Sequence, residues 1–346
     1  MNETLRRRRV TRVTTLSVLL LALLLVVGLN LVLGQFALTP SQVWDALLNR
    51  TDTPEAERAA NVLWQIRMPR IVLCLLVGAA LAVAGTLLQG LFGNPLAEPS
   101  VIGVTSGAGV GAACAIVLNL TVFGAATVPL LAFATGVLTT LVIYRLSSIN
   151  GQVKVLTLIL TGIAVNAVAG AAISFLIFLA PTSSREQVIF WQMGSLNGSQ
   201  WDHVGIVVIP VVVCLVAAML IAGQLDVLSL GERAAGHAGI NVPMMRVVIV
   251  GLSTALAALA VSFAGIIGFV GLIVPHILRQ VIGASSRWLV PLSAVGGAVL
   301  LLLSDLASRT MIAYADLPIG IFTALVGGPT FFVLLRRMLK KGDVLG

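Results

Sequence analysis

The chain has 346 residues, of which 58% are hydrophobic and only 10% are charged. A soluble domain is about 45–50% apolar and about 25% charged, so this chain has too little polar surface to enclose a water-soluble core. The same composition excludes a disordered chain. The net charge of +8 comes from few residues that flank apolar runs, which is typical of orientation signals in a bilayer and does not indicate a nucleic-acid partner.

The first apolar run follows a basic N-terminal segment. Residues 1–12 contain five arginines, and the run continues from about residue 13 to residue 33. A helix of this length crosses a hydrocarbon layer of about 30 Å. Because no small-residue cleavage motif follows the run, we expect a retained first span with residues 1–12 in the cytoplasm.

Nine further spans are predicted from the remaining apolar segments. They lie at about 70–91, 101–118, 124–146, 155–180, 204–222, 289–308 and 317–338, with two short or broken spans inside 247–283, where Gly265, Gly268 and Gly271 offer places to turn. With ten spans, fifteen Lys and Arg residues fall on the side of the termini and six on the other side. This asymmetry predicts one all-α polytopic domain over residues 1–346 with both termini in the cytoplasm.

Two segments between spans are long enough to form structure of their own. Residues 34–69 are expected outside the membrane and contain a short helix at 39–48 with a Thr or Ser cap. Residues 223–246 are expected inside. Leu225 and Leu228 share a helical face, and Gly231 permits a turn before a run of small residues. This pattern predicts either a compact knob of two short helices that fits a groove on a partner, or an ordinary polar loop.

The sequence contains little chemistry of its own. It has no nucleotide-binding phosphate loop, no metalloprotease motif and no hydrolase nucleophile motif. Asp305 is the acid placed well within a span, and its spacing to Arg309 favours an i,i+4 ion pair over a proton relay. Arg67, Arg70 and Arg309 mark the outer rim, where they either extend to the membrane surface or form a basic patch that docks an acidic partner.

An ordered series of short motifs resembles the FecCD-type permeases. These are membrane subunits of binding-protein-dependent ABC importers for iron-siderophores, haem and cobalamin. The matching stretches are Arg67–Arg70, Gly78–Gly85, Gln89 with Gly93–Pro99, Leu160–Gly162, Trp191–Leu196, Leu230–Glu232, Ala264–His276, Leu317–Gly320 and Gly327–Pro329. They extend from about residue 60 to the C-terminus. Gly93 departs from the pattern, since many relatives carry a basic residue there.

The resemblance implies a type II ABC importer permease with ten transmembrane helices in the bacterial inner (plasma) membrane. The implied partners are a second permease subunit, identical or homologous, two cytoplasmic ATPase subunits, an extracytoplasmic substrate-binding protein and membrane lipid. ATP and Mg would be held by the ATPases, with no cofactor and no enzymatic activity in this chain. Iron-siderophore complexes are the first expected cargo, haem or cobalamin is the alternative, and an ion-coupled secondary transporter is the alternative from a different class.

The resemblance also implies roles for particular residues. Arg67, Arg70 and Arg309 would dock the binding protein. The translocation path and its gate would include Gln89, Asn94, Pro95, Leu96, Val155 and Asn166. The contact with the ATPase would be made by Leu228, Leu230, Gly231, Glu232, Arg233, Ala234 and Gly239.

Overall fold

The computed structural model describes residues 2–149, 152–153, 155–312 and 314–341. Apart from a hairpin of two-residue strands, the described residues form helices and their connections, which confirms the all-α class. The elements in chain order are α1 (Asn2–Val32), α2 (Pro40–Leu47), α3 (Pro54–Asn61), the π-helical η1 (Val62–Arg67), α4 (Met68–Phe92), η2 (Pro99–Ile102), α5 (Val104–Val117), η3 (Gly124–Ala126), α6 (Thr127–Leu146), β1 (Ser148–Ile149), β2 (Gln152–Val153), α7 (Val155–Leu179), α8 (Thr182–Met193), α9 (Trp201–Leu228), α10 (Glu232–His237), α11 (Val242–Ala264), α12 (Val270–Ile282), α13 (Ser286–Thr310) and α14 (Ile319–Lys341).

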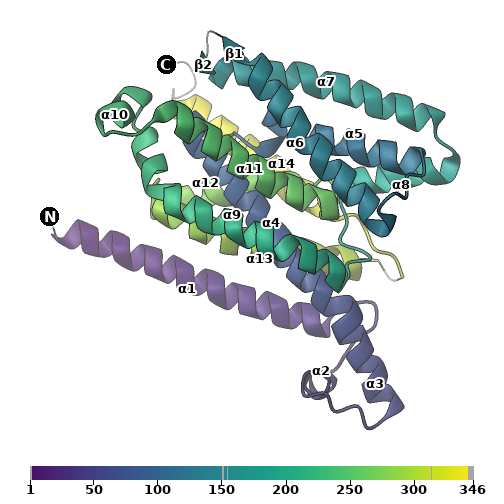
Figure 1. The fold of residues 1–346 in the computed structure, drawn as a ribbon. Coiled ribbons are helices and arrows are strands. Elements are labelled where there is room, and N and C mark those ends of the chain that lie inside the picture. Colours follow the sequence, from purple (N-terminus) through teal and green to yellow (C-terminus); the bar gives the residue numbers. More distant parts are fainter. Residues whose placement is uncertain (1, 150–151, 154, 313, 342–346) are drawn as a thin grey trace.

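Helix α4 forms the centre of the bundle (Figure 1) and packs against α9, α11, α12 and α13. Helices α5 to α8 gather at one side, where α11 connects them to the centre, and α1 lies along the opposite edge against α13. The centre of α4 is buried almost without interruption from Val77 to Gly90. A helix that is apolar on all sides must be covered on all sides, and α4 has this composition.

Seven helices among the described residues are long and apolar enough to cross a membrane. They include α1, α7, α9, α11 and α13, and a continuous helical segment, Pro54–Phe92, that contains α4. Three shorter apolar helices, α5, α12 and the Ile319–Val333 part of α14, lie where the other three spans were predicted. Helix α12 has 13 residues, about 20 Å at 1.5 Å per residue, which is shorter than a bilayer core. The count of ten complete spans therefore stays a prediction.

Glycines allow α4 to approach its neighbours closely. A Cβ atom on Gly85 would lie 1.9 Å from the Gly271 carbonyl oxygen of α12, and one on Gly78 would lie 2.4 Å from the Gly297 carbonyl oxygen of α13. Small residues at helix crossings are the usual means of close packing in lipid. Gly271 was expected as a place to turn, but it lies inside α12 and serves this crossing.

The predicted break between residues 247 and 283 is confirmed. Helix α11 ends at Ala264, and Gly265 with φ +68° begins an irregular segment that extends to Phe269, also at φ +68°. The predicted knob segment differs from expectation at its start, because α9 continues to Leu228, six residues beyond the predicted end of its span at residue 222. Leu225 and Leu228 are buried and extend the core face of that helix.

Candidate functional site

The two ends of the bundle carry the groups that the sequence analysis singled out. One end, here called the arginine end, contains α2, α3, the start of α4 and the end of α13. The other, the knob end, contains the end of α9, residues 229–241 (the knob) and the start of α13. Figure 1 shows α2 and α3 at one extremity of the bundle and α10 at the other.

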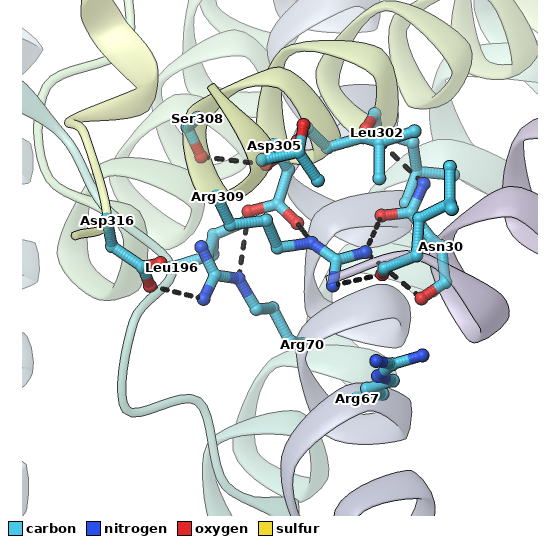
Figure 2. A network of polar contacts seen from close by, with 12 residues as sticks. Asn30, Arg67, Arg70, Leu196, Leu302, Asp305, Ser308, Arg309 and Asp316 are labelled. Carbon is cyan, nitrogen blue, oxygen red and sulfur yellow. Dashed lines mark hydrogen bonds and ion pairs between the residues drawn. The ribbon is translucent and has the colours of Figure 1, made fainter. Parts of the chain in front are cut away.

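The buried side chains of Arg70, Asp305 and Arg309 form the centre of the arginine end (Figure 2). The Arg70 Nε atom donates to Asp305 Oδ1 at 2.9 Å, and Arg70 Nη1 donates to Asp316 Oδ2 at 2.8 Å. The Asp305 Oδ2 atom lies 3.4 Å from Arg309 Nε, so the predicted i,i+4 pair is confirmed. Since the Asp305 side chain is only 1% exposed, its charge is neutralised by two arginines and not by water.

Arg309 and Arg67 connect this centre to α1. The Arg309 guanidinium donates to the Asn30 side-chain oxygen at 2.7 Å and to the Leu33 carbonyl at 2.8 Å. Arg67 donates to the backbone carbonyls of Leu31 and Phe36. These carbonyls lie at the end of α1 and in the turn after it, where a helix leaves its last carbonyls without internal partners. The guanidinium groups therefore also act as caps for α1.

The side chains of the three rim arginines are buried, so extension to the membrane surface is the wrong alternative, and their docking role stays a prediction. Arg67, Arg70 and Arg309 are 4%, 9% and 7% exposed, and neither extension to the membrane surface nor an open basic patch describes them. They turn inward because carboxylates of α13 and of the loop after it, and carbonyls at the end of α1 and in the turn after it, lie there. Among the described residues, no carboxylate lies within ion-pair distance of Arg67, whose guanidinium borders a cavity of about 190 Å³ beside Arg70 and Arg309.

A larger hollow of about 590 Å³ lies beside the arginine network. One face of α8 lines it with Ser183, Glu186, Gln187, Phe190 and Trp191, a spacing of three and four residues that places side chains on one side of a helix. Phe263, Gly265 and Asp316 complete the wall from other elements. The sequence analysis missed α8, although this repeating spacing was visible between residues 183 and 191.

The loop after α8 is held between two helices. Ser195 donates its backbone N–H to the Ala264 carbonyl at 2.8 Å, and Ile319 donates to the Gly194 carbonyl at 2.9 Å. A Cβ on Gly265 would lie 2.2 Å from the Trp191 carbonyl oxygen, so glycine is required there by contact as well as by its positive φ. The wall of the hollow thus joins α8, α11 and α14.

At the knob end, most of the predicted ATPase-contact residues are exposed. After α9 ends at Leu228, Gly231 adopts φ +113° and redirects the chain into α10. Leu230 is 77% exposed, whereas Ala235 is buried and anchors the short helix. Of the seven predicted contact residues, Leu228 is buried, and the exposed ones are Leu230, Gly231, Glu232, Arg233, Ala234 and Gly239. The predicted compact knob is therefore present, with one short helix and the end of α9 in place of two short helices.

The knob and the predicted gate lie together. A cavity of about 230 Å³ is lined by Gly93 and Val155 from the gate region and by Leu228, Gly231 and Glu232 from the knob region. Its wall also contains Arg246 of α11, which forms an ion pair with Glu232.

The gate turn itself is held by side chains. The Asn94 side-chain oxygen accepts from the Leu96 N–H at 2.9 Å, an Asx turn that leads through Pro95. Burial raises the pKa of the Glu98 carboxyl, which accepts from the Ser100 hydroxyl at 2.6 Å. Asn94, Pro95 and Leu96 are half-buried, so the turn is accessible in part from the surface.

Two predicted path residues have internal partners instead of an open lining position. Gln89 is fully buried, and its side-chain amide donates to the Gly271 and Leu272 carbonyls at 3.2 Å. These are carbonyls of the first turn of α12 that face α4 across the close crossing. The Asn166 amide on α7 donates to the Ser100 carbonyl at 3.0 Å and accepts from the Ser106 hydroxyl at 2.6 Å. Both amides connect helices within this chain.

Helix α13 connects the two ends. At the knob end, the Asp226 carboxylate on α9 accepts from the Ser285 hydroxyl at 3.1 Å and from the Ser286 backbone N–H, which caps the start of α13. At the arginine end, the same helix carries Asp305 and Arg309. A displacement of the end of α9 is therefore linked by a hydrogen-bonded contact to the helix that carries the arginine network.

Comparisons with known proteins agree with this architecture. The family model of the FecCD transport family matches residues 20–337. The hemin transport system permease protein HmuU of Yersinia pestis is 37% identical over 331 residues, covering 93% of this chain and 97% of the relative. The cobalamin import system permease protein BtuC of Halobacterium salinarum is 42% identical, covering 81% of this chain and 74% of the relative. The molybdate import system permease protein MolB of Haemophilus influenzae is 35% identical, covering 93% and 96%.

Solved structures show the same fold. A metal-chelate type ABC transporter in an inward-facing conformation matches with a TM-score of 0.81 and 32% identity, covering 92% of this chain and 97% of that chain. PsaBC from Streptococcus pneumoniae matches with a TM-score of 0.57 and 16% identity, covering 84% and 94%, which is a likeness of fold alone. The chain belongs to the FecCD transport family and is a multi-pass membrane permease of the ABC importer type.

Proposed function

We propose that this permease imports iron-siderophore complexes by ATP-driven alternating access. In the working complex, two permease subunits, identical or homologous, enclose a central path. Two cytoplasmic ATPases bind at the knob end, and an extracytoplasmic binding protein docks at the arginine end. The termini lie in the cytoplasm under this orientation. ATP and Mg are bound by the ATPases, and this chain supplies the path and the mechanical link.

The shape of the knob supports the ATPase contact. Small residues, Gly231, Ala234, Gly236, Ala238 and Gly239, make up much of its exposed surface, and Leu230 offers an apolar anchor that is 77% exposed. Burial of this leucine in an apolar groove of a partner would be favourable. Gly231 and Glu232 of the knob line the same cavity as Val155, a residue of the proposed gate, which supports a direct link between the two. Movement of the knob would therefore reach the gate directly, as alternating access requires.

Leu230→Gln tests this contact in the complete complex. We expect the variant to lose most of the ATPase stimulation by loaded binding protein, while the permease folds normally, because Leu230 makes few contacts within the chain. Leu146→Gln is the matched control, since Leu146 is 63% exposed at the end of α6, outside the knob. Equal stimulation in both variants and the wild type would remove the coupling role.

Docking at the arginine end rests on Arg67. Its guanidinium borders the 190 Å³ cavity, and its partners are backbone carbonyls, so a carboxylate from the binding protein would provide its missing counter-charge. Arg70 and Arg309 serve chiefly to hold the network and contribute positive potential. Arg67→Gln should weaken docking most at low salt, where screening is least. Docking that is unchanged at every salt concentration would contradict this role.

The cargo is inferred from the 590 Å³ hollow. Its lining combines the aromatic rings of Phe190, Trp191 and Phe263 with the acids Glu186 and Asp316, and no basic side chain lines it among the described residues. Such a wall favours a neutral or cationic metal chelate over anions such as molybdate or haem with its two propionates. Haem and cobalamin are kept as alternative cargoes.

Uptake by proteoliposomes that contain the whole complex separates the cargoes. Labelled ferric hydroxamate chelate, haem, cobalamin and molybdate are each supplied with the binding protein and ATP. We expect the ferric chelate to accumulate and the other three to remain at background. Preferential uptake of haem or cobalamin would reassign the cargo, and it would leave the permease function intact.

An ion-coupled secondary transporter is the alternative class. Such a carrier needs an acidic side chain that can take up and release an ion, whereas Asp305 is held by Arg70 and Arg309. Uptake should therefore require hydrolysable ATP and resist ionophores. Uptake that continues without nucleotide and stops with an ionophore would support the carrier instead.

A further inference from the structure

A fourth cavity, a hollow of about 500 Å³, lies at the knob end between α1 and the turn that joins α12 to α13. Helix α1 contributes Arg7, Arg8, Thr11 and Arg12, and the other wall is formed by residues 281–285. At 100° per residue, these four α1 side chains occupy one face of the helix, while Arg6 and Arg9 lie on the opposite face. The hollow therefore collects three of the five N-terminal arginines.

Arg12 connects the two walls of this hollow. Its Nε atom donates to the Ile282 carbonyl at 3.5 Å, and its guanidinium carbon lies 5.8 Å from the centre of the Trp288 ring of α13. Cation–π contacts of this kind orient an arginine without neutralising its charge. Gly283 with φ +88° ends α12 and turns the backbone around the hollow.

The charges in the hollow have no ion-pair partner among the acids between positions 45 and 316. Arg7 and Arg8 are exposed, and none of those carboxylates lies within ion-pair distance of Arg7, Arg8 or Arg12. Asp226, the nearby acid, is directed to Ser285 and Ser286 instead. Three cations around one hollow of this size constitute a site for an anion.

The surroundings of the hollow indicate what kind of anion fits. Exposed apolar side chains continue from both walls: Val18, seven residues after Thr11 on the same face of α1, is 57% exposed, and Ile277 and Val281 of α12 are 47% and 51% exposed. Arg12 is the last charge before the apolar run of α1, which places the hollow at the level where lipid phosphates meet acyl chains. A ligand with an anionic head and apolar tails matches both parts.

We propose that this hollow binds the phosphate headgroup of an anionic phospholipid from the adjacent leaflet, with its acyl chains against α1 and α12. Basic pockets between transmembrane helices bind such headgroups, and each arginine near the surface contributes to the attraction. The bound lipid would brace α1 against the α12–α13 turn. This proposal is independent of the cargo and of the partner subunits.

Two double variants test the proposal in the complete transporter. R7Q/R8Q removes two cations from the hollow, and R6Q/R9Q removes two cations from the opposite face of the same helix. All four arginines are exposed in the structure, so the fold should tolerate either pair of substitutions. Each is reconstituted in nanodiscs of phosphatidylcholine with a minor share of phosphatidylglycerol, and the lipid retained after detergent extraction is quantified by mass spectrometry.

We expect R7Q/R8Q to retain about tenfold less phosphatidylglycerol than the wild type, or less still. R6Q/R9Q should retain nearly as much as the wild type. Equal losses in the two variants would overturn the site, because the attraction would then be a general effect of charge. Excess glycerol 3-phosphate should not displace the lipid, since it lacks the acyl chains; displacement would reassign the hollow to a soluble phosphate compound. Undiminished retention in R7Q/R8Q would also overturn the proposal.

Discussion

The two ends of the bundle differ in how they hold charge. At the arginine end, Asp305 is 1% exposed and is shared by Arg70 and Arg309. At the knob end, Glu232 pairs with Arg246, but the Glu232 side chain is 63% exposed. The first group is buried among three helices, and the second lies at the surface of a short helix.

This difference separates the part of the molecule that must stay intact from the part that can move. Buried charges that depend on one another resist partial displacement, because a single broken contact leaves an unpaired charge inside the protein. Exposed turns with few buried contacts open at small cost. The knob end is thus suited to respond to a partner, and the arginine end is suited to keep α1, α4 and α13 together while it responds.

The largest expected effect is therefore at Asp305. Asp305→Asn keeps the shape of the side chain and removes its charge, which leaves Arg70 and Arg309 with one counter-charge fewer in a buried site. We expect a loss of about 3–5 kcal/mol of unfolding free energy, measured by denaturant titration of the purified permease. Asp45→Asn is the control, because Asp45 pairs with Arg50 at 3.7 Å on the surface and should change stability by about 0–1 kcal/mol. Equal losses would erase the contrast between buried and exposed pairs.

For a movement of the knob end to affect the rest of the protein, the helices between the two ends must stay packed together and move as one body. Gly85→Ala tests this, since the new Cβ would lie 1.9 Å from the Gly271 carbonyl oxygen and force α4 away from α12. We expect a loss of about 1–3 kcal/mol and reduced transport. In Gly251→Ala, a Cβ meets no atom within 4 Å, and this control should be neutral or slightly stabilised. A stable, active Gly85→Ala variant would show that the close crossing is not needed.

The sequence alone predicted the structural features that are determined by residues close to one another in the chain. Apolar length predicted the spans that became α1, α7, α11 and α13, and glycine predicted the break at Gly265. The helical spacing of four residues predicted the Asp305–Arg309 pair. Each of these features is determined within a few residues of its own position, so one sequence contains the whole signal.

The features that were missed depend on distant residues. The burial of Arg70 follows from Asp305 and Asp316, which are more than two hundred residues away in sequence, and no local pattern shows that they meet. Helix α9 was predicted too short because its last six residues include Gln224 and Asp226, which lower the apolar signal although Leu225 and Leu228 still face the core. The resemblance placed Gln89 on the path, and no local pattern shows that its amide binds backbone carbonyls of α12; its role on the path stays a prediction.

A smaller effect on stability is expected at the contact that links the two ends. Asp226→Asn weakens the cap on α13, since the charge that faces the helix N-terminus is lost while a hydrogen-bond acceptor is kept. We expect a cost of about 0.5–2 kcal/mol in unfolding free energy, together with basal ATPase activity that no longer rises when loaded binding protein is added. The control is Asp202→Asn in the first turn of α9, at the other end of that helix. A variant that loses stability and keeps normal stimulation would assign Asp226 a purely structural role.

The smallest effect on stability is expected at Glu232, and it tests the opposite side of the comparison. Glu232→Gln keeps an oxygen that can accept from Arg246 and removes a charge that is mostly screened by water, so unfolding free energy should change by about 0–1 kcal/mol. Transport should nevertheless fall, because the pair holds the start of α10 to α11 at the wall of the cavity shared with the gate. The measurement is the number of cargo molecules moved per ATP hydrolysed. A ratio equal to that of the wild type would mean that the knob transmits force without this pair, and it would direct attention to the backbone turn at Gly231 instead.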